Sequence, residues 1–299
     1  MNKPTGRHLF AGAVIALAAM ACSTLPPPAR DAVRVLRVMS FNVRYDEPRD
    51  AANAWPERKD LVVATIDFHR VDIAGLQEVL STQLEDLREL LPEYGAVGVG
   101  RDDGKEAGEF NPVLFRKDRF RLLGSSTFWL SEEPDEPGLK GWDAACARVV
   151  TWARFQDLWT GETLVAFNTH FDHVGERARR ESARLVLSRL QRIAAGAPYF
   201  LTGDFNCTRE DAAYREIVSG EGGRTLLRDA RDISFRPPYG PPASFNGFRA
   251  EPASGLPIDH IFVGPSAEVL RVGILPATWS GRFVSDHNPV LAEVRLAPR

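Results

Sequence analysis

Six short polar clusters, each beside an apolar run, hold the residues of this sequence that could do chemistry. The stretch 167–173 reads FNTHFDH and follows the apolar run 163–167, so an amide, a carboxylate and two imidazoles stand together where a strand is expected to end. Four of the six histidines lie in such clusters. The other five clusters contain Asn42, Gln77 with Glu78, Asp204 with Asn206, Asp259 with His260, and Asp286 with His287.

Any one of these clusters could be a polar turn, a helix cap or an ion pair, but together they indicate a site that handles charge. Carboxylate and amide oxygens suit a hard divalent cation. Imidazoles beside carboxylates are held in one tautomer and can donate hydrogen bonds to an anion. The combination predicts phosphate-ester hydrolysis by a positioned water. The sequence has no CxxC or HExxH pattern, which disfavours zinc, and no GxSxG pattern of a serine hydrolase.

The elements that must position these residues are mostly strands, with helices in both halves of the chain. Helices are predicted at 56–69, 82–91, 176–195 and 210–218. This mixture favours sheets packed face to face with helices outside. Strands are predicted at 33–41, 71–76, 94–100, 112–116, 120–130, 148–155, 163–167, 198–202, 258–263, 269–275 and 289–295.

Arg179 stands apart from the other arginines of the helix predicted at 176–195. Helical spacing puts it on the same side as the apolar Ala183 and Leu187, one turn after the polar loop. It is therefore predicted to pair with a carboxylate in that loop or with a bound anion.

The motifs resemble those of the endonuclease/exonuclease/phosphatase superfamily. The resemblance implies an α+β fold, a four-layer αββα sandwich of two packed, mostly antiparallel β-sheets with helices outside. It also implies Mg²⁺- or Mn²⁺-dependent attack of water on a phosphate ester. The matching stretches occur in the family's order: SFNVRYD (40–46), GLQEV (75–79), NTHFDH (168–173), TGDFN (202–206), IDHIFV (258–263) and SDHNPV (285–290). STFWLS (126–131) and GWDAA (141–145) resemble the secreted bacterial branch, related to nocturnin-type and carbon-catabolite-repressor-type deadenylases.

By motif match, the resemblance also implies roles for single residues. Asn42, Glu78 and Asp286 correspond to the metal site, with Glu78 as the principal ligand. Asp204 corresponds to the residue that orients or deprotonates the attacking water, and Asn206 to its partner at the phosphate.

Two histidines correspond to donors to the phosphoryl oxygens. These are His170, with Asn168 beside it in the phosphate pocket, and His287, held by Asp259. Asp172 and His173 are expected to shape the loop behind the pocket.

Three residues are candidate substrate contacts: Arg44, Arg179 and Asn246. Arg44 stands where the abasic-site nuclease branch carries an acid, which argues against transferring that branch's DNA-repair activity. Trp129 and Trp142 could stack on a base or sugar, but burial in the core fits a tryptophan better.

The N-terminal segment has the pattern of an export signal. Lys3 and Arg7 precede an apolar run at 9–21, which is followed by Cys22. We predict a lipoprotein signal peptide at 1–21, lipidation at Cys22, a tether at 22–32 and one catalytic domain at 33–299. A plain signal peptide with an incidental cysteine is the alternative. The mature protein would be a monomer held by its lipid at the periplasmic face of the outer membrane or at the cell surface.

The charge of the chain bears on its partners. The net charge is −3 and becomes −5 without Lys3 and Arg7, which leaves 35 basic and 40 acidic residues. Such a chain lacks the broad positive field of tight nucleic-acid binders, so nucleic acid is not the favoured partner. We predict a metal-dependent phosphoesterase acting on a monoester or a diester. A 3′–5′ exoribonuclease or related nuclease, and a catalytically silent binding lipoprotein, are the alternatives.

Overall fold

The computed structural model describes residues 1, 35–220, 222, 224–249, 255–276 and 278–296. Apart from Met1, the predicted signal peptide, the tether and Cys22 lie outside the described residues. The elements in chain order are β1 (Val35–Asn42), η1 (Pro48–Asn53), α2 (Trp55–Phe68), β2 (Ile73–Gln77), α3 (Ser81–Leu90), β3 (Tyr94–Val97), β4 (Val113–Arg116), β5 (Phe120–Trp129), β6 (Val149–Asp157), β7 (Thr163–His170), α4 (Glu176–Ala194), β8 (Tyr199–Asp204), α5 (Ala212–Ser219), β9 (Arg228–Asp229), α6 (Ala230–Ile233), β10 (Asp259–Val263), β11 (Ala267–Ile274), β12 (Thr278–Trp279), β13 (Arg282–Phe283) and β14 (Val290–Leu296).

Two six-stranded sheets form the centre of the molecule. The first has the order β11-β14-β1-β2-β4-β3 and the second β5-β6-β7-β8-β10-β9. In each sheet one central pair is parallel, β1 with β2 and β7 with β8. Each parallel pair is connected through a helix, α2 in the first sheet and α4 in the second. The carboxyl ends of both parallel pairs therefore become available for a site.

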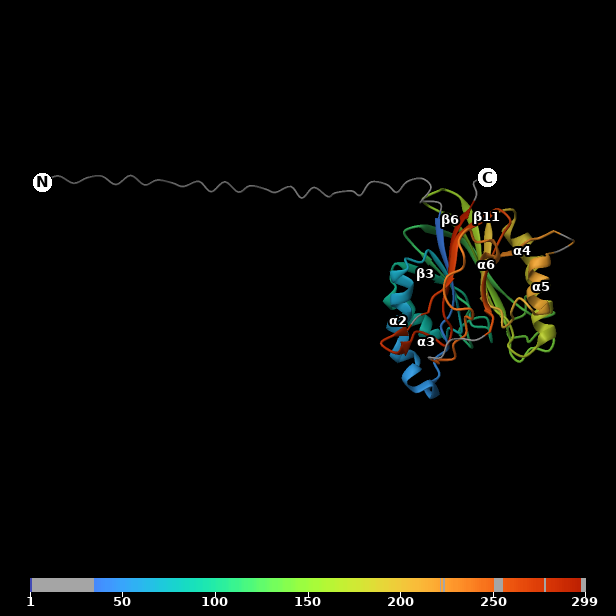
Figure 1. Cartoon of the computed structure of the whole chain (residues 1–299), viewed down its shortest axis with the longest axis horizontal. Helices are drawn as coiled ribbons and strands as arrows, with labels where there is room; N and C mark the ends of the chain where they lie inside the picture. The colour runs from blue at the N-terminus through green and yellow to red at the C-terminus, as the bar shows by residue number, and fades with distance from the viewer. Residues whose placement is uncertain (2–34, 221, 223, 250–254, 277, 297–299) are drawn as a thin grey trace.

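Side chains along each strand alternate between the two faces of its sheet, and this alternation produces the layers. On β1, Leu36 and Val38 face the core between the sheets, whereas Met39 and Phe41 face the helical side. Helices α2 and α3 cover the outer face of the first sheet, and α4 and α5 cover that of the second. Figure 1 shows the helices flanking the central strands on both sides. The predicted four-layer αββα sandwich is confirmed.

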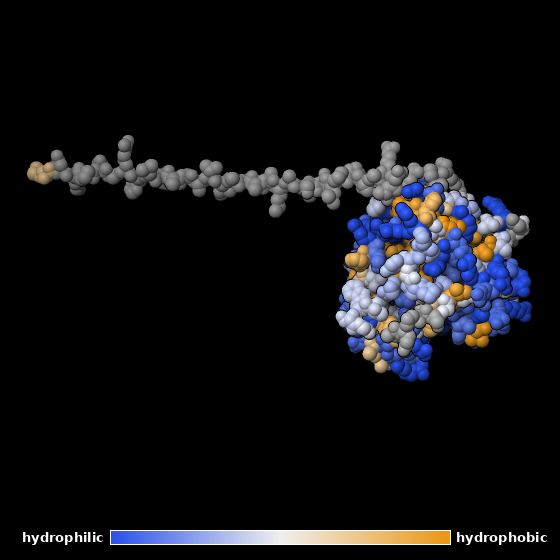
Figure 2. Space-filling model, viewed as in Figure 1, coloured by the Kyte–Doolittle hydropathy of each residue, from blue (hydrophilic) through white to orange (hydrophobic). Residues whose placement is uncertain are grey.

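The surface of the described part of the chain is largely polar. In Figure 2 the visible face is mostly hydrophilic, with hydrophobic residues in scattered groups. Within the described ranges, no helix combines the length and the apolar character needed to cross a bilayer.

Candidate active site

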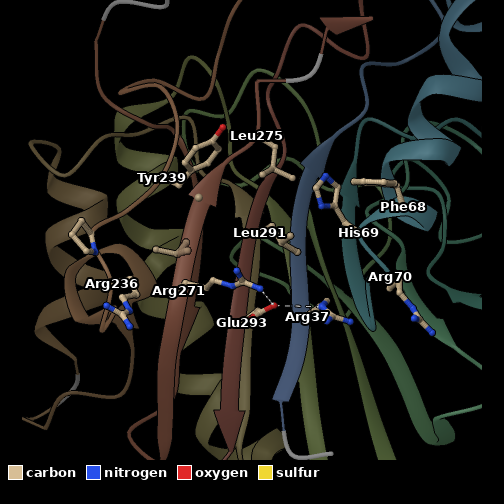
Figure 3. Close-up of a pocket in the computed structure, with 13 residues that line it drawn as sticks. Arg37, Phe68, His69, Arg70, Arg236, Tyr239, Arg271, Leu275, Leu291 and Glu293 are labelled. Carbon is tan, nitrogen blue, oxygen red and sulfur yellow. Dashed lines mark hydrogen bonds and ion pairs between the residues drawn. The ribbon is translucent and has the colours of Figure 1, made fainter. Parts of the chain in front are cut away.

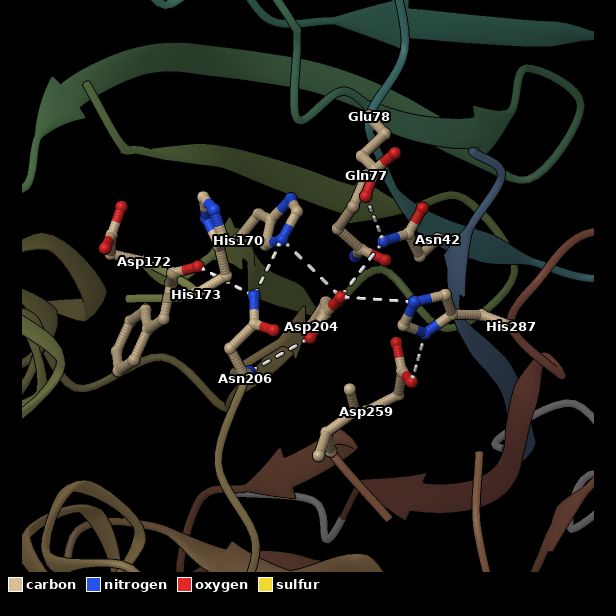
Figure 4. Close-up of polar contacts among 12 residues, drawn as sticks. Asn42, Gln77, Glu78, His170, Asp172, His173, Asp204, Asn206, Asp259 and His287 are labelled. Atoms are coloured by element: carbon tan, nitrogen blue, oxygen red, sulfur yellow. Dashed lines mark hydrogen bonds and ion pairs between the residues drawn. The ribbon is translucent and has the colours of Figure 1, made fainter. Parts of the chain in front are cut away.

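The polar clusters meet because their strands end at one edge of the sandwich. Asn42 is the last residue of β1 and Glu78 follows β2, while His170 and Asp204 end the parallel strands β7 and β8. Asp259 begins β10 and pairs in register with Asp204. Strands from both sheets thus deliver side chains to one place, where Figure 4 shows them turned toward one another.

Asn42 links the acidic residues of the two sheets. Its Nδ2 donates to Glu78 Oε1 at 2.9 Å and to Asp204 Oδ2 at 3.0 Å. Its Oδ1 accepts the backbone N–H of Arg44 at 2.9 Å. In this arrangement the amide of Asn42 positions the two carboxylates, and its place in the metal site stays a prediction.

Asp204, Asp259 and His287 form a buried charged group. His287 Nδ1 lies 2.8 Å from Asp259 Oδ2, and its Nε2 lies 3.7 Å from Asp204 Oδ2. Burial lowers the pKa of His287, but the carboxylates of Asp259 and Asp204 outweigh burial and raise it well above its usual value. Burial and the nearby Asp259 raise the pKa of Asp204. The group pairs an imidazolium with a carboxylate that can accept a proton.

His170 has the opposite character. Its Nε2 lies 3.0 Å from Asn206 Nδ2 and 3.5 Å from Asp204 Oδ2. Burial and two nearby arginines hold the pKa of His170 well below its usual value, so the ring is neutral. His170 Nδ1 is buried without a hydrogen-bond partner in the described chain and lies 4.0 Å from Glu109 Oε2. Sequence reasoning missed Glu109 as a site residue, because it comes from a charged loop with no motif of its own.

Three site residues adopt the left-handed backbone conformation that non-glycine residues rarely adopt. Arg44 has φ 57°, Glu78 has φ 60° and Asn206 has φ 46°. The tight turns after β1, β2 and β8 impose this strain, and hydrogen bonds such as Tyr45 N–H to Glu78 Oε2, 3.2 Å, hold it in place. Strain of this kind gathers at functional sites.

The cation of Arg44 lies among carboxylates. Its guanidinium is 2.9 Å from Asp50, 3.7 Å from Glu78 and 3.9 Å from Asp286. Arg44 was a candidate substrate contact, but here it neutralises the acidic side of the site. Burial, and then the nearby Glu78 carboxylate, raise the pKa of Asp286, which reflects the crowding of negative charge.

The donor set fits a hard divalent cation. Candidate ligand atoms of Glu78, His170 and Asp204 lie within 4.8 Å of one another, and the same holds for Asp204, Asp259 and His287. Carboxylate oxygens dominate both groups, and their mutual repulsion is what a bound Mg²⁺ or Mn²⁺ would relieve.

Asn168 is not part of the phosphate pocket, which corrects the prediction that grouped it with His170. It is fully buried between the sheets, where its Nδ2 donates to the carbonyls of Leu76 at 2.6 Å and Pro112 at 3.0 Å. Its Oδ1 accepts from Gln77 Nε2 and Thr202 Oγ1. Side chains two apart on a strand share a face, and Asn168 lies one step deeper than His170.

Arg179 and the 172–173 pair build the loop after β7. Arg179 Nη1 donates to the backbone carbonyl of Asp172 at 2.9 Å, and no ion pair of Arg179 occurs in the described part of the chain. The predicted carboxylate partner is therefore replaced by a carbonyl.

Asp172 accepts N–H groups of Val174 and Gly175, and His173 Nδ1 lies 3.0 Å from Arg148 Nη2. Asp172 and His173 shape the loop behind the pocket.

Asn246 and Phe245 border the His287 side of the site. Asn246 Nδ2 donates to the Ser285 carbonyl at 3.1 Å and its Oδ1 accepts from Phe248 N–H, so its side chain holds the segment before His287. Phe245 is 49% exposed and its ring lies edge-on to His287, with centroids 5.0 Å apart. Sequence reasoning missed Phe245, because one aromatic residue in a loop carries no signal. Trp129 is buried, as predicted, whereas Trp142 is only partly buried.

A four-layer sandwich whose parallel strands end in this carboxylate and imidazole site defines a class of phosphate-ester hydrolases. Residues 39–287 match the model of the Endonuclease/Exonuclease/phosphatase family, so the chain belongs to that family, whose members hydrolyse phosphate esters.

The chain is also similar to several solved structures and to one curated protein. An endonuclease/exonuclease/phosphatase from Bacteroides vulgatus is 47% identical, covering 88% of this chain and 99% of that one, with a TM-score of 0.84. A mannosyl-6-phosphatase from Bacteroides thetaiotaomicron is 38% identical over 87% of this chain and 99% of its own, with a TM-score of 0.82. The human nocturnin catalytic domain, 20% identical over 88% of this chain and 94% of that one, shares the fold with a TM-score of 0.68. An uncharacterised protein of Acanthamoeba polyphaga mimivirus is 22% identical over 78% of this chain, which spans 39% of that relative's length.

Proposed function

We propose that this chain is a metal-dependent phosphoesterase that hydrolyses a phosphate monoester of a sugar. The observation that carries the reaction type is the meeting of Asp204, Asn206, His170 and the His287–Asp259 pair at one end of the sandwich. The similarity to a mannosyl-6-phosphatase over nearly that protein's whole length supports a sugar phosphate as substrate.

The residues divide the reaction between them. Asp204, with a raised pKa, orients the attacking water and accepts its proton as the water oxygen bonds to phosphorus. The bond from phosphorus to the sugar oxygen breaks, and the sugar oxygen takes up a proton from solvent. His287, charged and held by Asp259, donates from Nε2 to a phosphoryl oxygen as negative charge builds. Asn206 and the neutral His170 hold each other beside Asp204 and complete the pocket.

Glu78 and Asp286 would hold the metal through carboxylate oxygens. When bound, the ion supplies positive charge to the phosphoryl oxygens. Asn42 keeps Glu78 and Asp204 in place, and Arg44 offsets the remaining acidic charge.

We also propose that the protein is exported and anchored through a lipid on Cys22. The support for this is the basic start, the short apolar run and the cysteine of residues 1–22.

The test is hydrolysis by residues 31–299 with Mg²⁺, Mn²⁺ or EDTA. The panel holds mannose 6-phosphate, an aryl phosphomonoester, an aryl phosphodiester, a short RNA, a nucleotide and sphingomyelin. We expect metal-dependent turnover, fastest on mannose 6-phosphate, that falls about 10²-fold or more in Glu78→Gln. The exposed Glu85→Gln is the matched control. Preference for RNA would replace the sugar phosphate with a nuclease function, and turnover unaffected by EDTA would reject the mechanism.

A further inference from the structure

A groove crosses the outer face of the first sheet, away from the active site. Its volume is about 520 Å³. The floor is formed by β1, β14 and β11, one wall by the end of α2, and the other by residues 236–239 (Figure 3). Arg37 on the floor stands five residues before Asn42 on β1, about 16 Å along the strand. The groove is therefore a separate feature of the molecule.

The groove has an excess of positive charge. On the floor, Glu293 Oε1 lies 3.5 Å from Arg37 Nε and 2.6 Å from Arg271 Nη2, so one carboxylate serves two guanidinium groups. Arg70 on one wall and Arg236 on the other have no ion-pair partner in the part of the chain that the structure describes. Four arginines against one glutamate is unusual for a chain with a net charge of −3. The excess of positive charge along the groove favours a bound anion.

Each wall also presents an aromatic ring. Phe68 is 78% exposed and Tyr239 is 65% exposed, and Figure 3 shows them on opposite sides of the floor. Leu275 and Leu291 supply apolar floor between them. Each wall thus combines one ring and one arginine over a partly apolar floor.

Backbone hydrogen bonds hold the main chain of both walls. Tyr239 N–H donates to the Val272 carbonyl at 3.0 Å, and Ile274 N–H donates to the Tyr239 carbonyl at 2.9 Å, which fastens this wall to the edge of β11. On the other wall, Arg70 adopts a left-handed φ of 49° at the end of α2, and its N–H donates to the Asp67 carbonyl at 2.8 Å.

We propose that this groove is a second, non-catalytic binding site for a phosphorylated ring compound, either a sugar phosphate or a nucleotide. Guanidinium groups bind phosphate through paired hydrogen bonds. The ring of the ligand packs against Phe68 and Tyr239. The volume is in the range of small-ligand pockets. The inference rests on the groove and does not depend on the proposed catalytic function.

Calorimetric titration of the full-length protein in EDTA, which suppresses turnover, tests the proposal. The ligands are mannose 6-phosphate, adenosine monophosphate, mannose and inorganic phosphate. We expect one of the two phosphorylated ring compounds to bind, and which one binds identifies the source. The Arg70→Ala/Arg236→Ala variant should bind it at least tenfold more weakly, with hydrolysis at the active site unchanged. Arg192→Ala/Arg224→Ala, at exposed positions elsewhere, is the matched control.

A second variant separates the ring from the anion. Tyr239→Ala should weaken binding of the phosphorylated ring compound and leave binding of inorganic phosphate unchanged. Equal affinity in the wild type and the Arg70/Arg236 variant would overturn the proposal. So would a result in which neither ring compound binds. Phosphatidylglycerol vesicles are titrated alongside, and Arg70/Arg236-dependent binding to them alone would identify the face as a membrane surface.

Discussion

His170 and His287 occupy the same site with opposite charge states. Both rings are buried, and both lie within 4 Å of Asp204. The difference comes from their other neighbours, since His287 contacts the Asp259 carboxylate whereas His170 lies near two arginines. Pairs of titratable groups whose pKa values are shifted in opposite directions in this way divide the acid and base roles of a reaction.

Asp259→Asn tests the charge of His287. Removing the carboxylate lowers the pKa of His287, so the imidazolium is lost at a lower pH. The alkaline limb of the kcat/KM profile should therefore move to lower pH, and kcat/KM at pH 8 should fall about 10²-fold. A pH series with mannose 6-phosphate measures this, with the exposed Asp232→Asn as control. An unchanged alkaline limb would remove His287 from the donor role.

At the scale of elements, the two sheets approach closely beneath the site. A Cβ added at Gly75 on β2 would lie 2.0 Å from Thr202 Oγ1 on β8, so only glycine fits there. Asn168 crosses this narrow gap and joins β7 to β2 and to the Pro112 carbonyl. Hydrogen bonds of Asn168 thus connect the two sheets directly beneath the site.

Asn168→Ala should weaken this connection between the sheets without removing a catalytic group. It removes the four hydrogen bonds that this fully buried side chain makes with Leu76, Gln77, Pro112 and Thr202, so the free energy of unfolding should fall by about 3–5 kcal/mol. Urea denaturation measures the loss, with Asn53→Ala as control. For the fraction that stays folded, kcat should remain within a few fold of wild type. A large drop in kcat with unchanged stability would show that Asn168 is a catalytic residue, as the sequence predicted.

Neighbouring residues of strand β10 point to opposite faces of the sheet and have different functions. Asp259 faces the site, whereas His260 faces the outer core, where its Nδ1 lies 3.1 Å from Asp229 Oδ2 and its Nε2 lies 3.1 Å from the Cys207 carbonyl. Burial lowers the pKa of His260, but the hydrogen bond and charge of Asp229 outweigh it and raise the pKa. The stability from this pair is therefore fully present below the unfolded pKa near 6.5 and is lost as pH rises through the folded pKa.

The pH dependence of unfolding checks this pair. Between pH 6 and pH 9 the free energy of unfolding of the wild type should fall more than that of His260→Gln, in which the titrating group is gone. Guanidinium denaturation at four pH values gives the two slopes. Parallel slopes would show that His260 does not carry a charge in the folded protein.

At the scale of the whole molecule, the direction of β1 sets the position of the site relative to the N-terminal segment. Val35 begins β1 and Asn42 ends it at the active site, about 23 Å further along. In the proposed lipoprotein, anchoring would therefore act at the opposite end of β1 from the chemistry.

Cys22→Ser tests the proposed anchor. The wild type should sediment with membranes and incorporate labelled palmitate, and the variant should do neither. Activity on a soluble phosphate ester should be the same for both, because Cys22 precedes every described strand. Equal distribution of the two proteins between membrane and soluble fractions would reject lipidation at Cys22.

The sequence by itself determined the fold class and most of the site. Apolar runs and the polar residues that end them are local patterns, and Glu78, His170, Asp204 and Asp259 each sit at such an end. Only the tertiary structure decided which of two residues that are close in the sequence reaches the pocket. Asn168 and His170 are two residues apart and look alike in the sequence, yet only the packing of the second sheet against the first encloses Asn168 between the sheets and leaves His170 at the site.

The tertiary structure also decided the features that depend on distant segments meeting. Glu109 reaches His170 from a separate loop, and the charge of His287 depends on Asp259 across 28 residues. The arginine groove draws on β1, α2, β11 and residues 236–239. No local pattern encodes these contacts, because burial and Coulomb interactions depend on distances in space that the order of residues does not specify.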